Sequence, residues 1–388
     1  MREAVITAAV RTPVGKIKSA YAQMDVDALG GIVIKEAIKR ANVKPEEVEE
    51  VIFGNCRNVD LKTPARVAAV AAGLPESCPA YVCERGCASA LNAIWLAAMQ
   101  VREGQGDIYV AGGMESTSKA PFLMASEMVG NRVPPKWLFG RSLPNGMADP
   151  SMGQTAENVA KKLNITKEDC DAFAVESQRR AAKAWENGYF DEQIVPVEAP
   201  FGKKETKLIT KDETVREDTT MESLAKLKLS FSKEDGVCTA GNSSPLTDGA
   251  SAVVVMEKEL AQSRGLEILG TIKGFASAGL DPAYMGLGPV YATRKLLDKF
   301  NLTLDDIDLI EMNEAFAPQS VGCIRELGMD TEKVNVNGGA IALGHPFGAT
   351  GAILVTKLVY EMKRRDVKRG IVSFCIGGGQ GAAMLIER

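Results

Sequence analysis

The sequence has few of the features that direct a protein to a membrane or to nucleic acid. Its formal net charge is only −4 over 388 residues, which gives no electrostatic basis for binding nucleic acid or an anionic membrane. No stretch approaches the roughly 20 apolar residues that a membrane span needs. The apolar run near the N-terminus is too short, and too charged at its flanks, for a signal peptide. We therefore expect a cytoplasmic protein without membrane or nucleic-acid partners.

Histidine is nearly absent, and cysteine lacks metal-binding spacing. The eight cysteines are scattered without a Cys-x-x-Cys pair, and there is one histidine. These residues cannot complete the usual Cys/His sets that bind zinc, so we expect reduced thiols and no metal. Apolar residues at 45% and charged residues at 25% are typical of a globular protein. A chain of this length is expected to form two or three core-forming units.

The only histidine, His345, lies in the glycine-rich segment Gly338–Gly348. A lone histidine is more often a packing or surface residue than a functional one. Here the glycines let the backbone approach a ligand closely, and Pro346 fixes the chain direction directly after the ring. Imidazole titrates near neutral pH and can relay a proton. We therefore expect His345 to take part in chemistry.

Segments from the two ends of the chain resemble one another in the same order. The three pairs, separated by roughly 260 residues, are Val51–Asn55 with Leu309–Asn313, Gly86–Ala90 with Gly348–Ala352, and Ile108–Gly113 with Val372–Gly378. Chance similarity between short apolar strands is the alternative, but the matching order favours duplicated α/β units. Short buried strands alternating with helices predict an α/β fold, with helices on the faces of a mixed or parallel sheet.

Between the two halves the composition changes. A capping signal at Thr166–Asp169 precedes an amphipathic stretch that ends near Asn187. A lysine-rich segment follows, from Lys203 to Lys228, which we interpret as a solvated face or as contacts for a phosphorylated ligand. We predict an N-terminal half over residues 1–117, an insertion over 118–247 that returns into that half near its end, and a C-terminal half over 265–388.

Two cysteines lie where apolar strands end. Cys87 precedes an apolar helix, and a thiol at a helix N-terminus is expected to have a lowered pKa that favours thiolate. On position alone, a buried structural cysteine is an equally good interpretation. Cys375 leads into Gly377–Gly381. Because a further strand follows, this run is not the phosphate loop of a nucleotide site, and we expect its N–H groups to face a developing oxyanion.

These two thiols, His345 and Asn313 form a candidate catalytic set. One thiolate would attack a carbonyl, the imidazole would keep it ionised, and the second thiol would move a proton. Asn313 is suited to hold a water or to polarise an oxygen.

In its ordered set of motifs the chain resembles the thiolases, the acyl-CoA C-acyltransferases, over essentially its whole length. Each motif alone is weak, but the ordered set is specific. The motifs include Cys87–Ser89, Ala111–Ser116, Met152–Asn158, Thr239–Ser244, Met285–Pro289, Asn313–Phe316, Gly338–Gly348 and Cys375–Gly381. The resemblance implies a thiolase-like duplicated five-layer α-β-α-β-α core with an inserted loop domain.

The resemblance also implies a role for each candidate residue. Cys87 matches the acylated nucleophile, and His345 matches the residue that activates it and contributes to an oxyanion hole. Asn313 matches the residue that holds a water in that hole. Cys375 matches the acid/base thiol that deprotonates the second acetyl-CoA at Cα. The backbone N–H groups of Cys87 and Gly377 match a second oxyanion hole.

Acyl-CoA and CoA are the implied partners, as substrates, and no cofactor is implied. CoA is expected along the insertion. The positions that match the family's CoA contacts are Leu143, Met152, Arg216, Ser223, Phe231, Ala240, Ser244, Leu246, Met285 and Phe316. Related enzymes are dimers or tetramers, so we expect a homodimer or homotetramer.

Three positions depart from the family's usual pattern. Glu84 stands where Asn is usual, and we expect it to alter dimer contacts. Ala90 stands where Gly is usual, and we expect its methyl to tighten the acyl side of the pocket. Ser151 stands where short-chain biosynthetic members often carry His. These changes leave the reaction class intact and leave acyl chain length and direction open.

The prediction is therefore reversible Claisen condensation of two acetyl-CoA to acetoacetyl-CoA, or thiolysis of 3-ketoacyl-CoA, through an acyl-Cys87 intermediate. One alternative is a degradative thiolase of fatty-acid β-oxidation that prefers longer chains. Another is a thiolase-fold CoA-binding partner that has lost turnover. A decarboxylating ketoacyl synthase is a third, but the single histidine and Cys375 argue against it.

Overall fold

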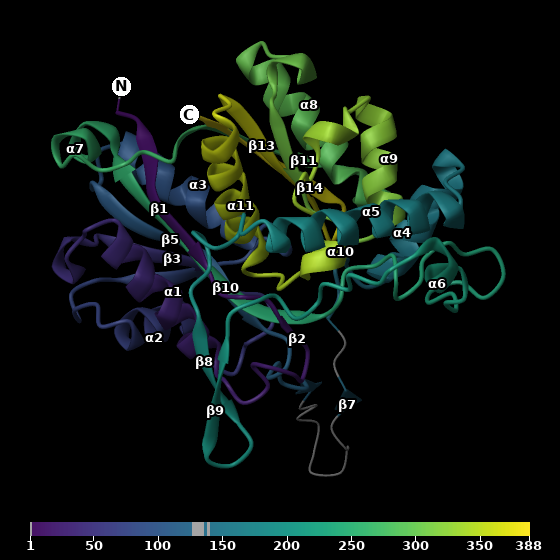
Figure 1. Cartoon of the computed structure of the whole chain (residues 1–388), viewed down its shortest axis with the longest axis horizontal. Coiled ribbons are helices and arrows are strands. Elements are labelled where there is room, and N and C mark those ends of the chain that lie inside the picture. The colour runs from purple at the N-terminus through teal and green to yellow at the C-terminus, as the bar shows by residue number, and fades with distance from the viewer. Residues whose placement is uncertain (1, 126–135, 138–139) are drawn as a thin grey trace.

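The strands of both halves join in one ten-stranded sheet. The computed structural model describes residues 2–125, 136–137 and 140–388, and Figure 1 shows the whole arrangement. The N-terminal half contributes β1 (Ala4–Arg11), β2 (Gly15–Lys16), β3 (Glu50–Gly54), β4 (Ala80–Cys83), β5 (Ile108–Ser116) and β10 (Thr247–Glu257). The C-terminal half contributes β11 (Gly270–Gly279), β12 (Leu309–Met312), β13 (Arg369–Ile376) and β14 (Gln380–Glu387). Most of these strands are apolar throughout because helices cover both faces of the sheet.

The order of the strands confirms the predicted duplication. The sheet order is β12-β13-β14-β11-β1-β10-β5-β3-β4, so β3-β5-β10-β1 in one half mirrors β12-β13-β14-β11 in the other. In both halves the first pair is parallel and the next two pairs are antiparallel. The halves meet where β1 pairs with β11 over only two registered residue pairs. The two predicted β layers are therefore continuous with each other at this short junction.

Helices form the three remaining layers. On the outer face of the N-terminal half lie α1 (Val26–Arg40) and α2 (Pro64–Ala71), and on that of the C-terminal half lie α8 (Gly288–Phe300) and α9 (Ala317–Leu327). Between the halves, α3 (Ser89–Arg102) packs against α11 (Thr350–Arg365). This central pair of helices positions two members of the candidate catalytic set, because Cys87 directly precedes α3 and His345 precedes α11.

The central helices approach each other unusually closely. A Cβ at Gly351 would lie 2.1 Å from the backbone N of Leu91, and a Cβ at Gly113 would lie 1.9 Å from the carbonyl oxygen of Gly348. Glycine is required where backbones come this close. We call the glycine-rich segment Gly338–Gly348 the histidine loop. These contacts hold its C-terminal end against β5 and the start of α3.

The chain leaves the N-terminal half of the sheet at Ser116 and returns to it at Thr247. The elements between are β6 (Met124–Ala125), β7 (Lys136–Trp137), α4 (Met152–Leu163), α5 (Lys167–Glu186), β8 (Val197–Phe201), β9 (Glu205–Ile209) and α6 (Met221–Ala225). A capping box of Thr166 and Asp169 starts α5, as predicted. Although the insertion interrupts the N-terminal half, α4 and α5 pack on α9 of the C-terminal half. The exact domain boundaries stay a prediction.

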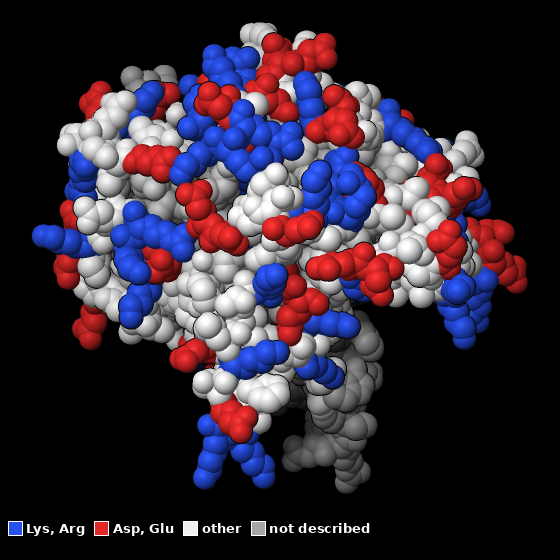
Figure 2. All heavy atoms as spheres, in the orientation of Figure 1, with Lys and Arg blue, Asp and Glu red and all other residues white. Residues whose placement is uncertain are grey.

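Short elements complete the fold. Within the described ranges they are α7 (Lys258–Ser263), α10 (Ala340–Leu343) and 3₁₀ helices at Pro45–Glu47, Pro282–Leu287, Leu304–Asp306 and Thr331–Lys333. Among the described helices, none combines the length and the hydropathy needed to cross a bilayer. On the face shown in Figure 2, basic and acidic side chains are interspersed.

Candidate active site

Cys87 lies in a tight turn between β4 and α3, as the sequence predicts. The turn is held by its own polar groups. Gly86 adopts a positive φ of 51°, and its N–H donates to Glu84 Oε1 at 2.7 Å. The hydroxyl of Ser89 donates to the Gly86 carbonyl at 2.6 Å and accepts from the Arg85 N–H at 2.8 Å. Glu84 therefore supports the turn that carries Cys87.

The expectation of a lowered Cys87 pKa is wrong for the free protein. Burial raises the pKa of the Cys87 thiol to about 11. Hydrogen bonds from the backbone N–H groups of Gly377 and of Cys87 itself act in the opposite direction but do not outweigh burial. The thiol is thus protonated at neutral pH. The same two N–H groups are those predicted to form an oxyanion hole, and they converge on the sulfur.

The hydrogen bonds of His345 define its tautomer. The Thr350 hydroxyl donates to the Pro346 carbonyl at 2.8 Å. Its oxygen lies 2.7 Å from His345 Nδ1 and, with its proton already committed, must accept from Nδ1–H. Nε2 is therefore the unprotonated nitrogen, and burial lowers the pKa of the ring to about 3. The single imidazole is neutral, with a basic nitrogen available at Nε2.

Asn313 is the partner of that nitrogen. Its Nδ2 lies 3.3 Å from His345 Nε2 and donates to it. The side chain is fully buried, and among the described residues its Oδ1 has no hydrogen-bond partner. Buried polar atoms are normally satisfied by protein or water. An unpaired acceptor beside the histidine fits the predicted role of holding a water.

Cys375 lies at the end of β13, buried beside an apolar group. Burial raises the pKa of its thiol well above the ordinary value, and the nearby Cys87 adds to this effect. Cys375 packs with Ala315, Met285, Met152 and Phe316. Three of the predicted CoA-contact positions thus surround the second thiol.

The remaining predicted CoA contacts are spread more widely. The ring of Phe231 meets the ring of Phe316 edge to face, with centroids 5.8 Å apart, and the Ser244 N–H donates to the Ala315 carbonyl. Ser142, next to Leu143, approaches the Gly377–Gly378 turn. The side chains of Arg216, Ser223, Ala240 and Leu246 are exposed, and the structure does not bring them onto the catalytic set.

The two other departures from the family pattern have local explanations. The hydroxyl of Ser151 caps α4 by accepting from the Gln154 N–H at 3.4 Å. Ala90 is fully buried, and Cβ atoms at Gly54, Gly113 and Gly351 would each lie within 3.0 Å of one of its atoms. Its methyl therefore packs in the interior between α3, α11 and the sheet, which does not support the expected effect on the acyl pocket.

Sequence reasoning assigned no role to Glu115 or Thr350. The carboxylate of Glu115 accepts from the backbone N–H groups of Cys56 (3.2 Å), Arg57 (3.0 Å) and Gly348 (2.8 Å). It thereby fixes the end of the histidine loop. Burial raises its pKa to about 7. An acidic residue two positions after the Gly112–Gly113 pair, near the end of an otherwise apolar strand, was the signal that could have identified it.

No group of three or more His, Cys, Asp or Glu side chains that could hold a metal occurs within residues 2–125, 136–137 and 140–388. All eight cysteines are free thiols.

Two family models match the chain. The thiolase N-terminal domain matches residues 4–259 and the thiolase C-terminal domain matches residues 266–388. Among curated proteins, an acetyl-CoA acetyltransferase of Cupriavidus necator is 46% identical, and a probable acetyl-CoA acyltransferase of Staphylococcus aureus is 42% identical, each over 100% of both chains.

Solved structures have the same fold. An acetyl-CoA acetyltransferase of Bacillus anthracis superposes with a TM-score of 0.94 at 43% identity, over 100% of this chain and 99% of that one. A human mitochondrial 3-ketoacyl-CoA thiolase in complex with CoA superposes with a TM-score of 0.93 at 37% identity, over 100% and 98% of the two chains.

Proposed function

This chain belongs to the thiolase family, and we propose that it condenses two acetyl-CoA to acetoacetyl-CoA and runs the reverse thiolysis through an acyl group on Cys87. The observation that carries the proposal is the hydrogen-bonded set at the centre of the fold. The neutral His345 has an unprotonated Nε2, which accepts a hydrogen bond from Asn313 Nδ2. The Cys87 sulfur accepts hydrogen bonds from the backbone N–H groups of Gly377 and of Cys87 itself. The relatives named as acetyl-CoA acetyltransferases support the same assignment.

In the first half-reaction, the Cys87 sulfur attacks the thioester carbonyl. The thiol and the imidazole are both neutral in the free protein, so the thiol proton passes to Nε2 of His345 as the new C–S bond forms. The carbonyl oxygen becomes an oxyanion, which N–H donors stabilise in a water-poor site. The tetrahedral adduct then expels CoA thiolate, which takes a proton from the Cys375 thiol.

In the second half-reaction, Cys375 acts as a base. Its thiolate removes a proton from Cα of the second acetyl-CoA, and the carbanion attacks the acyl-Cys87 carbonyl. The raised pKa of Cys375 suits this task because a more basic thiolate abstracts a carbon-bound proton more readily. Expulsion of the Cys87 sulfur, with return of the His345 proton, completes the cycle. The apolar side chains of Met152, Met285 and Phe316 exclude water from this step.

The test is mass spectrometry of the acid-quenched enzyme after mixing with acetoacetyl-CoA and then with 3-ketoacyl-CoA esters of increasing length. We expect an acyl adduct on the Cys87 peptide of the wild type and none in a folded Cys87→Ala variant. A Cys78→Ala variant removes a buried thiol that packs in the N-terminal core, away from the site, and serves as the control. Transfer that persists without Cys87 would refute the nucleophile. Binding of CoA by a wild type that forms no adduct would favour the partner-protein alternative.

We also propose that two copies associate along the β4 edge. This strand ends the sheet, since β3 is the only strand that pairs with it in the described part of the chain. Exposed apolar side chains gather on it and on the helices beside it, at Tyr81, Val67, Val70 and Met99. An unprotected edge with apolar neighbours is a site for strand pairing. A homodimer would pair these edges next to the Cys87 turns, and light scattering of wild type and Tyr81→Lys tests it.

A reducing, cytoplasmic compartment is proposed for the same chemistry. The mechanism needs two thiols to stay reduced, and all eight cysteines are free. CoA and its esters act as substrates in this scheme, and we propose no cofactor.

A further inference from the structure

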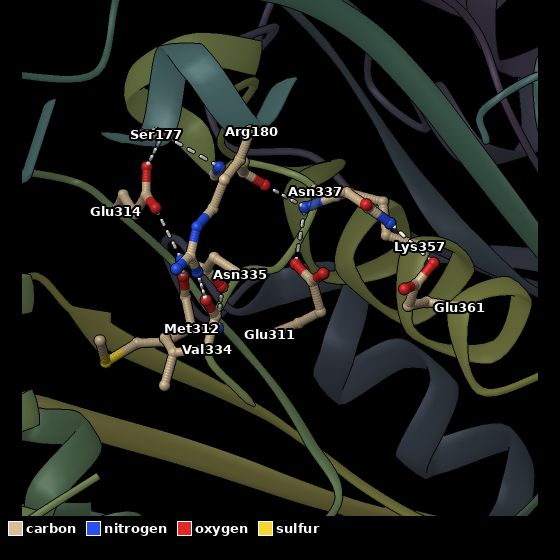
Figure 3. A network of polar contacts seen from close by, with 12 residues as sticks. Ser177, Arg180, Glu311, Met312, Glu314, Val334, Asn335, Asn337, Lys357 and Glu361 are labelled. Carbon is tan, nitrogen blue, oxygen red and sulfur yellow. Dashed lines mark hydrogen bonds and ion pairs between the residues drawn. The ribbon is translucent and has the colours of Figure 1, made fainter. Parts of the chain in front are cut away.

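Helix α5 carries two adjacent buried polar residues that face the histidine loop. Ser177 is 4% exposed and Gln178 is 1% exposed, and both belong to the insertion. Figure 3 shows Ser177 turned toward Glu314 and the start of that loop. Buried polar side chains on a helix need partners, and here the partners lie on other elements of the fold.

The Ser177 hydroxyl connects α5 to two catalytic segments at once. It donates to Glu314 Oε2 at 2.7 Å and accepts from the Gly339 N–H at 3.1 Å. The same carboxylate oxygen accepts from the Ile341 N–H at 3.2 Å. Glu314 directly follows Asn313. Gly339 and Ile341 lie at the start of the histidine loop, which also contains His345. One hydroxyl and one carboxylate thus fix the two residues that contact each other at Nε2.

The start of the histidine loop is also held by close packing and by buried charged side chains. A Cβ at Gly339 would lie 2.1 Å from the Glu314 carboxyl carbon. Gly338 has a positive φ of 75°, and its carbonyl accepts from the buried Lys357 at 2.6 Å. Lys357 also pairs with Glu311 at 2.6 Å, as Figure 3 shows. The turn is therefore held by buried charges on both sides.

Gln178 links the loop to the segment that is predicted to contact CoA. Its Nε2 donates to the Ile341 carbonyl at 3.4 Å, and its Oε1 accepts from the Arg216 N–H at 2.8 Å. Arg216 is one of the predicted CoA contacts. A single buried amide therefore joins the histidine loop to the CoA-contact segment.

We propose that Ser177 and Gln178 are positioning residues that make α5 the connection between CoA binding and the catalytic histidine. Ser177 sets the relative position of Asn313 and His345. Gln178 fixes the position of the Arg216 backbone relative to the same loop. The inference rests on the proposed function, because it takes Cys87 acylation and CoA contact at Arg216 as given. Small misplacements of reacting groups cost large factors in rate, which gives these remote residues a measurable effect.

The first experiment compares Ser177→Ala with Ser251→Ala. Ser251 is a fully buried serine on β10 that also loses hydrogen bonds on truncation, to Val10 and Thr356, but it does not touch the histidine loop. We expect Ser177→Ala to lower kcat and the single-turnover rate of Cys87 acylation by about 10-fold, with the KM for CoA within twofold of wild type. Ser251→Ala should lose thermal stability alone. Equal kinetics for the two variants would overturn the role of Ser177.

The second experiment compares Gln178→Met with Gln193→Met. Gln193 is as buried as Gln178, and both of its amide atoms are also hydrogen-bonded, since its Oε1 accepts from Arg11 Nε and its Nε2 donates to the Tyr189 carbonyl. We expect Gln178→Met to raise the KM for CoA about fivefold and to lower kcat, and Gln193→Met to change neither. An unchanged KM in Gln178→Met would overturn the link to CoA.

Failure of this inference and failure of the proposed function give different results. If the wild type acylates Cys87 and the Ser177 and Gln178 variants match it, only the inference fails. If the wild type forms no acyl-Cys87 with any of the CoA esters, both the proposed function and this inference fail.

Discussion

The Oγ1 of Thr350 lies 2.7 Å from Nδ1 of His345, so a hydroxyl on α11 sets the tautomer of the chain's only imidazole. The same hydroxyl is committed to the Pro346 carbonyl. The loop and the first turn of the helix thus form one unit in which Nε2 is left basic. His345 and Thr350 are only five residues apart in sequence. Their contact nevertheless depends on the backbone conformation that connects the histidine loop to α11.

Replacing Thr350 by Val should disable the histidine without unfolding the protein. Valine has nearly the same shape but cannot accept from Nδ1–H, so the ring loses both its orientation and its preferred tautomer. We expect kcat/KM for thiolysis to fall by about 10- to 100-fold, since a partner that orients a catalytic histidine has effects of this size or larger. Thr293→Val is the matched control, because Thr293 on the outer helix α8 is equally buried but its hydroxyl contacts Ser373 on β13 and not the histidine ring. Similar losses in both variants would contradict the tautomer argument.

The free enzyme should react slowly with thiol reagents at neutral pH. Burial raises the pKa of Cys87 to about 11, so the thiolate, which is the reactive form, is scarce. We expect the rate of iodoacetamide alkylation at the Cys87 peptide to keep rising between pH 7 and pH 10. Mass spectrometry of quenched samples measures this rate. A plateau near pH 7 would instead indicate a thiolate stabilised by the helix N-terminus.

Glu115 should make the protein less stable as the pH rises. Burial raises its pKa to about 7 in the folded state from an ordinary value of 4.5, so the folded state holds the proton more tightly than the unfolded state does. The stability from this proton is complete below about pH 4.5 and is lost as the pH rises through 7. This difference between the folded and unfolded pKa corresponds to a loss of unfolding free energy on the order of 3 kcal/mol.

The measurement is urea unfolding of wild type and Glu115→Gln from pH 5 to pH 8. The free energy of unfolding of the wild type should fall relative to that of the variant over this range. Glu361→Gln is a control of opposite sign. Burial acts to raise the pKa of Glu361, but hydrogen bonds from Arg364, Asn337 and Arg365 together lower it, so its contribution is lost as the pH falls. Parallel pH profiles for wild type and Glu115→Gln would refute the assignment.

Ala90→Gly should affect stability and leave substrate range alone. The methyl is fully buried between α3, α11 and β5. Its removal, with the poorer helix propensity of glycine, should cost about 1 to 2 kcal/mol in unfolding free energy. Relative rates with acetoacetyl-CoA and longer 3-ketoacyl-CoA esters should match those of wild type. A changed chain-length profile would restore the interpretation that Ala90 borders the acyl pocket.

Several parts of the fold follow directly from local patterns. The duplicated segments appear as β3 and β12, as the starts of α3 and α11, and as β5 and β13. The strand after Gly377–Gly381, which argued against a nucleotide loop, is β14. These predictions succeeded because burial on both faces makes a strand apolar, and because glycines mark the turns that precede α3 and α11, at Gly86 and Gly348. Both signals are written in contiguous residues.

The site separates into what the sequence by itself determined and what only the tertiary structure decided. Residue type and order determined the reaction class, because two thiols, one imidazole and an amide in this series of motifs suit acyl transfer. Burial decided the protonation states, and it reversed the expected pKa shift of Cys87. Packing between distant elements decided that Glu115 holds Gly348 and that Ser177 reaches Gly339. The physical reason is that desolvation and hydrogen-bond geometry depend on neighbours more than 100 residues away, and no local pattern records them.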